Sequence, residues 1–113
     1  MEDKTAAIIV WCTAPDTAVA DTLASTLVQE GLAACVHVFP AGQSIYTWEG
    51  KLEKNVENVL MIKSRQPLYP QLQTRLRELH PYQVPEILMV PVRDGLPDYL
   101  SWLVQVTPGP ENV

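Results

Sequence analysis

The chain has 113 residues, 47% of them hydrophobic, and its 13 acidic residues outnumber its 8 basic residues for a net charge of −5. This length suits one globular domain that buries a core without metal or disulfide cross-links, and the hydrophobic content excludes a disordered chain. The few basic residues are scattered, so nucleic acid is not an expected partner, because binding to its phosphates needs a basic surface.

The chain shows no signal for a membrane or for export. No apolar segment approaches the roughly 20 residues that span a bilayer, and residues 1–4 carry acids where a signal peptide carries bases. We therefore expect a cytoplasmic protein with no membrane span. We interpret residues 1–113 as a single domain with a core at about 6–106 and frayed termini, including the tail Pro108–Pro110.

The first predicted elements are a strand and a helix. Residues 6–13 are apolar and rich in β-branched side chains, which is typical of a buried strand. Asp16 is a suitable N-cap for a helix at about 17–30, where apolar residues recur every four positions. Gly31 follows where a left-handed C-cap belongs.

A long hairpin is predicted next. Residues 33–39 begin a second strand, Pro40–Gly42 interrupts it, and pairing can resume at 44–48. A proline inside a strand predicts an edge strand or a bulge. Glu49-Gly50 is a plausible tight turn, and residues 51–65 return as the third strand.

The C-terminal half continues with a helix, a strand and a last helix. The second helix starts at Pro67 and ends at His80, because proline disfavours helical geometry in the residue before it. Residues 87–92 form the fourth strand, and a last helix opens at residues 95–97. We expect its two aromatic residues, Tyr99 and Trp102, to lie in the core.

The order βαββαβ with a terminal helix predicts an α+β, ferredoxin-like fold. Right-handed crossovers then place two helices on one face of an antiparallel sheet with strand order 4-1-3-2. The third strand lies between the first two, so Cys12 and Cys35 are separated by about 9–10 Å. A disulfide requires Cα atoms within about 7 Å, so we expect free thiols.

The hairpin of the second and third strands is about twice as long as the other strands. Its far half therefore has no sheet partner inside the subunit, although it carries Ile45, Tyr46 and Trp48. A lone hairpin is marginally stable in water, and an unpaired edge invites pairing with another chain. We therefore expect oligomerisation through this hairpin.

Several segments of the chain resemble motifs of one known family. They occur in order between about Ile8 and Leu103, and they are Trp11–Pro15, Gly31–Val36, Tyr46–Lys51, His80–Glu86 and Tyr99–Trp102. Together they make the chain resemble the CutA divalent-cation-tolerance family. The resemblance implies a ferredoxin-like homotrimer built through its long hairpins, binding of divalent ions, copper(II) in particular, and a shape similar to the PII signalling proteins.

The resemblance also implies a metal site at Cys12 and His80, with an ion that the fold does not require. Leu79 stands where some relatives carry a second histidine, which removes one ligand. Copper(II) binds nitrogen and sulfur tightly, so two ligands can suffice. The alternative, favoured by the general burial of cysteine, makes Cys12 a small core residue and His80 a helix cap. His37 is expected to be a surface or interface histidine.

A second group of candidate residues suggests a ligand pocket. Glu57 and Lys63 share one face of the third strand because they are six residues apart. Glu86 opens the fourth strand near Tyr82, and Trp48 lies on the overhanging hairpin. In a trimer these residues can meet in a cleft that binds a small ligand or ion. The alternative, favoured by the composition of interfaces, is an intersubunit ion pair between Lys63 and a glutamate, with the aromatic residues packed in the interface.

Three functions remain open from the sequence. The first is a homotrimeric protein that binds divalent metal ions, copper(II) in particular, and serves cation tolerance and the response to metal ions. The second is a PII-like signalling trimer with a small ligand in the cleft between subunits, and the third is a structural trimeric anchor for a partner protein. We expect no enzyme, because no catalytic motif is present.

Overall fold

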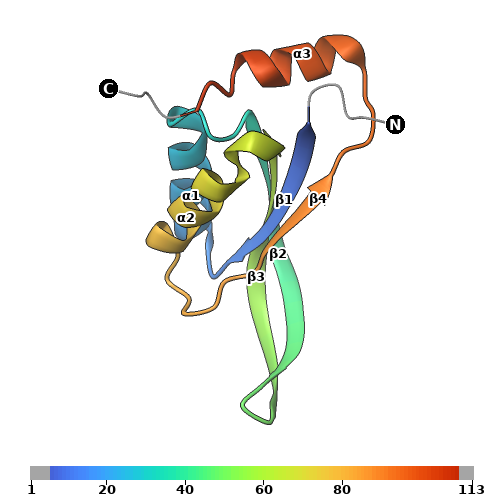
Figure 1. The fold of residues 1–113 in the computed structure, drawn as a ribbon. Helices are drawn as coiled ribbons and strands as arrows, with labels where there is room; N and C mark the ends of the chain where they lie inside the picture. Colours follow the sequence, from blue (N-terminus) through green and yellow to red (C-terminus); the bar gives the residue numbers. More distant parts are fainter. Residues whose placement is uncertain (1–5, 110–113) are drawn as a thin grey trace.

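A computed structural model describes residues 6–109 as a four-stranded antiparallel sheet with three α-helices (Figure 1). The elements are β1 (Ala7–Ala14), α1 (Thr17–Gln29), β2 (Cys35–Trp48), β3 (Lys51–Arg65), a 3₁₀ turn (Gln66–Leu68), α2 (Tyr69–Leu79), β4 (Ile87–Pro91) and α3 (Pro97–Gln105). The strand order is β2-β3-β1-β4, which is the predicted order read from the other edge. The predicted α+β, ferredoxin-like fold is confirmed.

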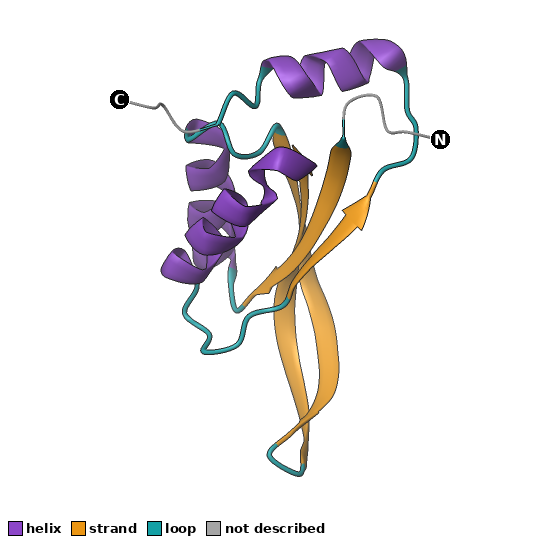
Figure 2. Cartoon of the chain, in the orientation of Figure 1, coloured by secondary structure: helices purple, strands orange, loops and turns teal. Residues whose placement is uncertain are grey.

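The main core lies between the sheet and the helices α1 and α2, which cover the same face (Figure 2). Strand side chains reach it at every second residue and helix side chains at every fourth. The larger side chains of this core are at most 1% exposed. They are Ile8, Val10, Cys12, Leu23, Leu27, Leu60, Ile62, Leu72 and Leu76.

Both ends of α1 follow the prediction. The Asp16 carboxylate accepts a hydrogen bond from the Val19 N–H at 2.8 Å and so caps the first turn. Gly31 adopts φ 71°, the left-handed conformation expected after a helix. Helix α2 starts later than predicted, at Tyr69, because Pro67 lies in the 3₁₀ turn before it.

The β2–β3 hairpin has both predicted irregularities. The pairing register shifts between Phe39 and Gly42, with Ala41 at φ 54°, which makes a bulge. At the tip, Glu49 and Gly50 both have positive φ, as a two-residue type I′ turn requires.

The outer part of this hairpin extends beyond the rest of the sheet. Strand β1 pairs with β3 only over residues 58–65, and β4 pairs only with β1. Within the described residues, the segment 42–57 therefore pairs only with itself, and it protrudes from the body (Figure 1). We call this segment the overhang.

Helix α3 differs from the expectation for its aromatic residues. Leu100 and Leu103 turn inward and pack with Ala7 and Ala34. Tyr99 and Trp102 remain 39% and 40% exposed and pack against each other, with ring centroids 5.5 Å apart. The predicted core position of these two residues is wrong, because the leucines occupy the buried side of the helix.

The segment after α3 is attached to the body. Arg65 donates through Nε to the carbonyl oxygen of Thr107 at 3.0 Å, and the Gly109 N–H donates to the Gly31 carbonyl at 3.0 Å. Pro108 and Gly109 were expected to fray, but these hydrogen bonds hold the segment against the body. Pro110 and the N-terminal residues expected to fray lie outside the described residues.

Both cysteines are free thiols, as predicted. Cys35 pairs with Lys63 of β3, and Cys12 pairs with Leu60 of the same strand, so β3 separates the two thiols. Within residues 6–109, each helix is too short or too polar to cross a bilayer.

Candidate functional site

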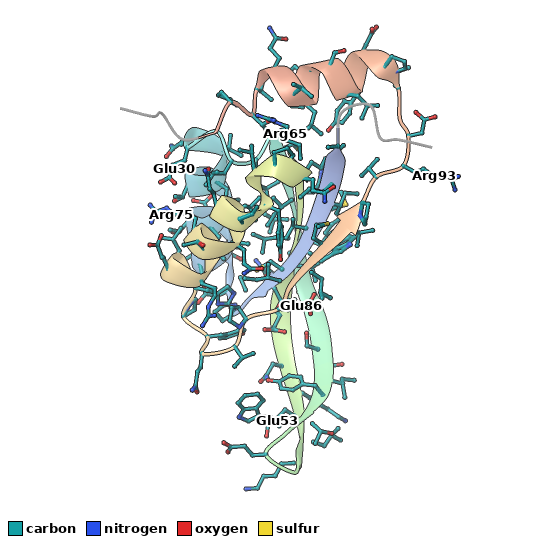
Figure 3. The ribbon with its side chains drawn as sticks, in the orientation of Figure 1. Glu30, Glu53, Arg65, Arg75, Glu86 and Arg93 are labelled. Carbon is teal, nitrogen blue, oxygen red and sulfur yellow. The ribbon has the colours of Figure 1, made fainter. Side chains whose placement is uncertain are left out.

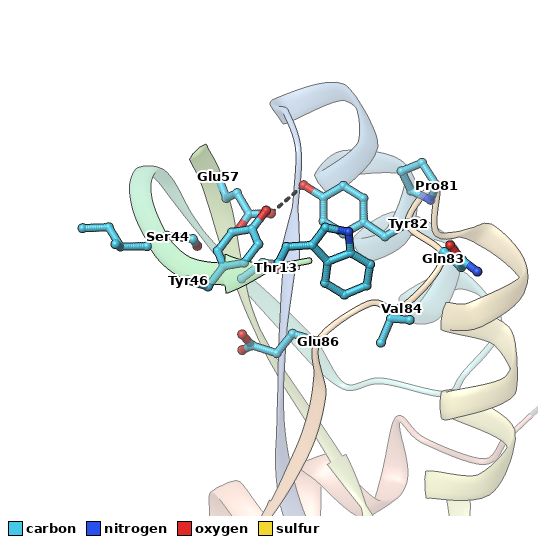
Figure 4. A pocket seen from close by; sticks show the side chains of 11 residues that line it. Thr13, Ser44, Tyr46, Glu57, Pro81, Tyr82, Gln83, Val84 and Glu86 are labelled. Atoms are coloured by element: carbon cyan, nitrogen blue, oxygen red, sulfur yellow. Dashed lines mark hydrogen bonds between the residues drawn. The ribbon is translucent and has the colours of Figure 1, made fainter. Parts of the chain in front are cut away.

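A cavity of about 730 Å³ lies where the overhang leaves the body (Figure 4). One wall comes from the overhang, and the other comes from the connection between α2 and β4. The lining residues are Thr13, Ser44, Ile45, Tyr46, Trp48, Glu57, Pro81, Tyr82, Gln83, Val84 and Glu86.

A hydrogen bond between Tyr82 and Glu57 connects the two walls. The Tyr82 hydroxyl donates to Oε2 of Glu57 at 2.5 Å, and Glu57 is only 6% exposed (Figure 4). Burial, and then the hydrogen bond to Glu57, raises the pKa of Tyr82 above its usual range. The phenol therefore stays protonated and serves Glu57 as a donor.

His80 holds the connection between α2 and β4 in place. Its Nδ1 accepts the Tyr82 N–H at 3.1 Å, so the ring proton lies on Nε2, which donates to the Thr13 carbonyl at 2.6 Å. The His80 ring also packs against that of Tyr82, with centroids 4.8 Å apart. Both ring nitrogens of His80 are thus occupied, and the residue is 7% exposed.

Cys12 lies beside the same carbonyl as His80. Its thiol donates to the Thr13 oxygen at 3.6 Å, and burial, followed by the nearby charge of Glu86, raises the pKa of Cys12 to about 12. At neutral pH the residue is therefore a thiol, whereas a metal is bound by the thiolate. The structure does bring Cys12 and His80 together, but as two protonated donors to one oxygen.

The pair Cys12 and His80 as folded therefore does not fit a metal ion. Among residues 6–109, no group of three or more His, Cys, Asp or Glu side chains is arranged to hold one. Binding at this pair would require His80 to give up both hydrogen bonds and Cys12 to lose its proton while buried.

Four of the five residues predicted for the ligand pocket line the cavity. They are Trp48, Glu57, Tyr82 and Glu86. Lys63 lies elsewhere, with Nζ over the Tyr99 ring, 5.7 Å from its centroid. Six residues of extended strand separate Lys63 from Glu57 by roughly 20 Å, so the two do not meet within one chain.

Thr13 and Ser44 also line the cavity but were not predicted. Thr13 matters through its carbonyl oxygen, which accepts from both Cys12 and His80. A backbone acceptor leaves no pattern in the side chains, so the sequence offers no signal for it beyond the motif in which Thr13 stands.

The charge of the cavity is negative. Glu57 and Glu86 are acidic, and none of the described residues that line the cavity is basic. Glu86 lies at the base of the overhang, whereas Glu53 lies further along it (Figure 3). The cavity is therefore suited to a cation rather than to an anion.

Comparison with known proteins identifies the family. Residues 8–106 match the family described as CutA1 divalent ion tolerance protein. A curated relative from Yersinia pestis, named divalent-cation tolerance protein CutA, is 53% identical over 97 residues, which cover 86% of this chain and 82% of the relative.

Solved structures agree with this match. A divalent cation tolerance protein from Thermus thermophilus has a TM-score of 0.88 and 42% identity, covering 89% of this chain and 98% of the other. CutA from Xylella fastidiosa has a TM-score of 0.89 and 40% identity, covering 90% and 98%. The resemblance inferred from the motifs is confirmed, and the chain belongs to the CutA1 divalent ion tolerance family.

Proposed function

We propose that this chain acts as a homotrimer in divalent-cation tolerance and binds its ion in the cavity beside Glu57 and Glu86. The observation that carries the proposal is the buried carboxylate of Glu57, which faces an acidic cavity without a cationic partner among the described residues. A buried charge is costly unless it is compensated. A divalent cation supplies that compensation and takes carboxylate oxygens as ligands.

Copper(II) is the ion we propose to bind there. For a given set of oxygen, nitrogen and sulfur ligands, copper(II) binds most tightly among the common divalent first-row metals. The proposal moves the ion from Cys12 and His80 to the carboxylates, and it gives His80 the role of positioning Tyr82. It assigns the chain no catalytic step and places the protein in the cytoplasm.

The trimer is proposed because the overhang exposes large apolar side chains. Ile45, Tyr46, Trp48, Leu52 and Val56 are all between 41% and 66% exposed. Packing the overhangs of other copies against them removes this apolar surface from water. The same packing would cover the open side of the cavity, which Ile45 and Trp48 help to line.

The PII-like and anchor hypotheses have less support. A small anionic ligand needs a base in the cavity, and Lys63 of the same chain lies over Tyr99 instead. An anchor would give no role to the acidic lining of the cavity. A thermal-shift screen of anionic metabolites on the wild type and on Lys63→Ala tests the signalling alternative, because a ligand stabilises the state that it binds.

Copper(II) titration by calorimetry tests the proposal. We expect Glu57→Gln to weaken binding at least tenfold, because the substitution keeps the shape and removes the charge. Glu53→Gln is the matched control, since Glu53 lies on the same strand but does not line the cavity.

Light scattering tests the proposed trimer. At micromolar concentration it should give the mass of three chains.

The same titration shows whether copper(II) binds at the carboxylates or at the pair Cys12 and His80. We expect Cys12→Ala to bind copper(II) as the wild type does. Wild-type affinity in Glu57→Gln together with a loss in Cys12→Ala would overturn the proposed site and restore the one predicted from the sequence.

A further inference from the structure

The face of the sheet opposite α1 and α2 carries a group of soft side chains at its β2 edge. Val36 and Val38 pack against the main core, so Cys35 and His37 alternate with them and lie on the other face. In the register of the hairpin, His37 pairs directly with Met61 of β3. All three of Cys35, His37 and Met61 are at least partly exposed.

The spacing of these residues suits one small ion. Directly paired side chains have Cβ atoms about 4.5–5.5 Å apart and diagonal pairs about 7–8 Å. Alternate residues of one strand are about 6.6 Å apart. Ligand atoms lie about 2.0–2.3 Å from a bound metal, so the imidazole, the thiol and the flexible thioether can close on a shared point.

The surroundings are aromatic rather than acidic. The His37 ring stacks on Phe39, with centroids 5.6 Å apart, and Trp11 of β1 pairs with Met61 on its other side. Lys63, the cross-strand partner of Cys35, holds its ammonium over the Tyr99 ring. Thiolate, thioether and imidazole without carboxylates form a donor set for a soft ion, and copper(I) prefers such ligands.

We propose that Cys35, His37 and Met61 form a second metal site, which binds a soft monovalent ion such as copper(I). This site differs from the acidic cavity in place and in chemistry. The cavity offers carboxylates to a divalent ion, whereas this cluster offers sulfur and nitrogen. The register of β2 against β3 creates it, because Met61 is far from Cys35 and His37 in the sequence.

Silver(I), which is soft, monovalent and stable to oxidation in aqueous buffer, is the probe. The chain has three methionines, Met1, Met61 and Met89. We expect the methyl resonance of Met61, assigned with Met61→Leu, to shift and to saturate at one silver ion per chain. The Met89 resonance should stay in place, because Met89 packs against the main core.

Variants of the full chain distinguish silver binding by the three residues together from silver binding by the thiol of Cys35 alone. We expect Cys35→Ala to abolish stoichiometric silver binding, and Met61→Leu and His37→Thr each to lower the affinity at least tenfold. Cys12→Ala and Met89→Leu are the matched controls and should bind as the wild type does.

Two results would overturn the second site. One is a Met61 resonance that does not move with one equivalent of silver. The other is wild-type affinity in both Met61→Leu and His37→Thr, which would leave only the thiol of Cys35. Glu57→Gln should bind silver normally, so failure of the acidic site and failure of this one are distinguishable.

Discussion

The body of the molecule and the overhang both carry large apolar side chains, which are buried in the body and exposed on the overhang. Leu72 and Leu76 are fully buried between helix and sheet, whereas Leu52 and Val56 on the overhang are each 66% exposed. The body buries its core within one chain, and the overhang has only its own two strands. The body therefore buries a core of its own, whereas the overhang leaves its large apolar side chains without cover inside the described chain, which is the reason for proposing that other copies cover it.

The largest effect is expected from a charge added to the overhang. We expect Ile45→Asp to reduce the mass in solution from three chains to one, because a carboxylate cannot be buried unpaired in an apolar interface. Light scattering measures the mass. Thr22→Asp adds the same charge to an exposed position of α1 and should leave the trimer intact.

The next largest effect is expected in the body. Leu76→Ala should lower the free energy of unfolding by about 3 kcal/mol, since it removes a buried side chain and leaves a cavity. Leu52→Ala, the same change on the overhang, should lower the stability of the body by less than about 1 kcal/mol. Equal costs in urea unfolding would show that the overhang belongs to the core.

Alkaline pH tests the buried thiol of Cys12 in the body. The pKa of Cys12 is raised from 9.0 to about 12, so between these values the folded state keeps a proton that the unfolded state has lost. Stability should therefore fall as pH rises from 9 to 12, on the order of 1 kcal/mol per pH unit from this group.

Urea unfolding of the wild type and of Cys12→Ala at about pH 8, 9.5 and 11, which bracket the ordinary pKa of a thiol, measures this fall. The variant should show a shallower loss of stability with pH, because it has no thiol at this position. Parallel curves for the two proteins would contradict the assignment of a buried, protonated Cys12.

The smallest effect is expected at the tip of the overhang. Gly50 has φ 78° and open space around the position of a Cβ, so Gly50→Ala should cost about 1 kcal/mol from backbone strain alone. Gly31 has φ 71°, but a Cβ there would lie 3.0 Å from the Gly109 carbonyl oxygen. Gly31→Ala should therefore cost more, and thermal unfolding of the two variants measures the difference.

Much of the fold was predictable because its signals are local. The period of two in the strands, the period of four in α1 and the cap at Asp16 all depend on neighbouring residues. The aromatic residues of α3 were misplaced because two faces of a short helix are apolar, and only packing decides which one is buried. Trp48, Tyr82 and Glu86 of the pocket stand in the family motifs, and Glu57 was inferred from the alternation of the third strand. The same alternation placed Lys63 with Glu57, but the length of the strand keeps the two apart within one chain.

The sequence by itself determined the elements, their order and the excess length of the hairpin, because periodicity, turn residues and the handedness of crossovers act over short stretches. Only the tertiary structure decided how Cys12 and His80 share the Thr13 carbonyl and which residue of β3 faces His37. The physical reason is register. A shift of one residue at the bulge between Phe39 and Gly42 would turn every side chain beyond it to the other face.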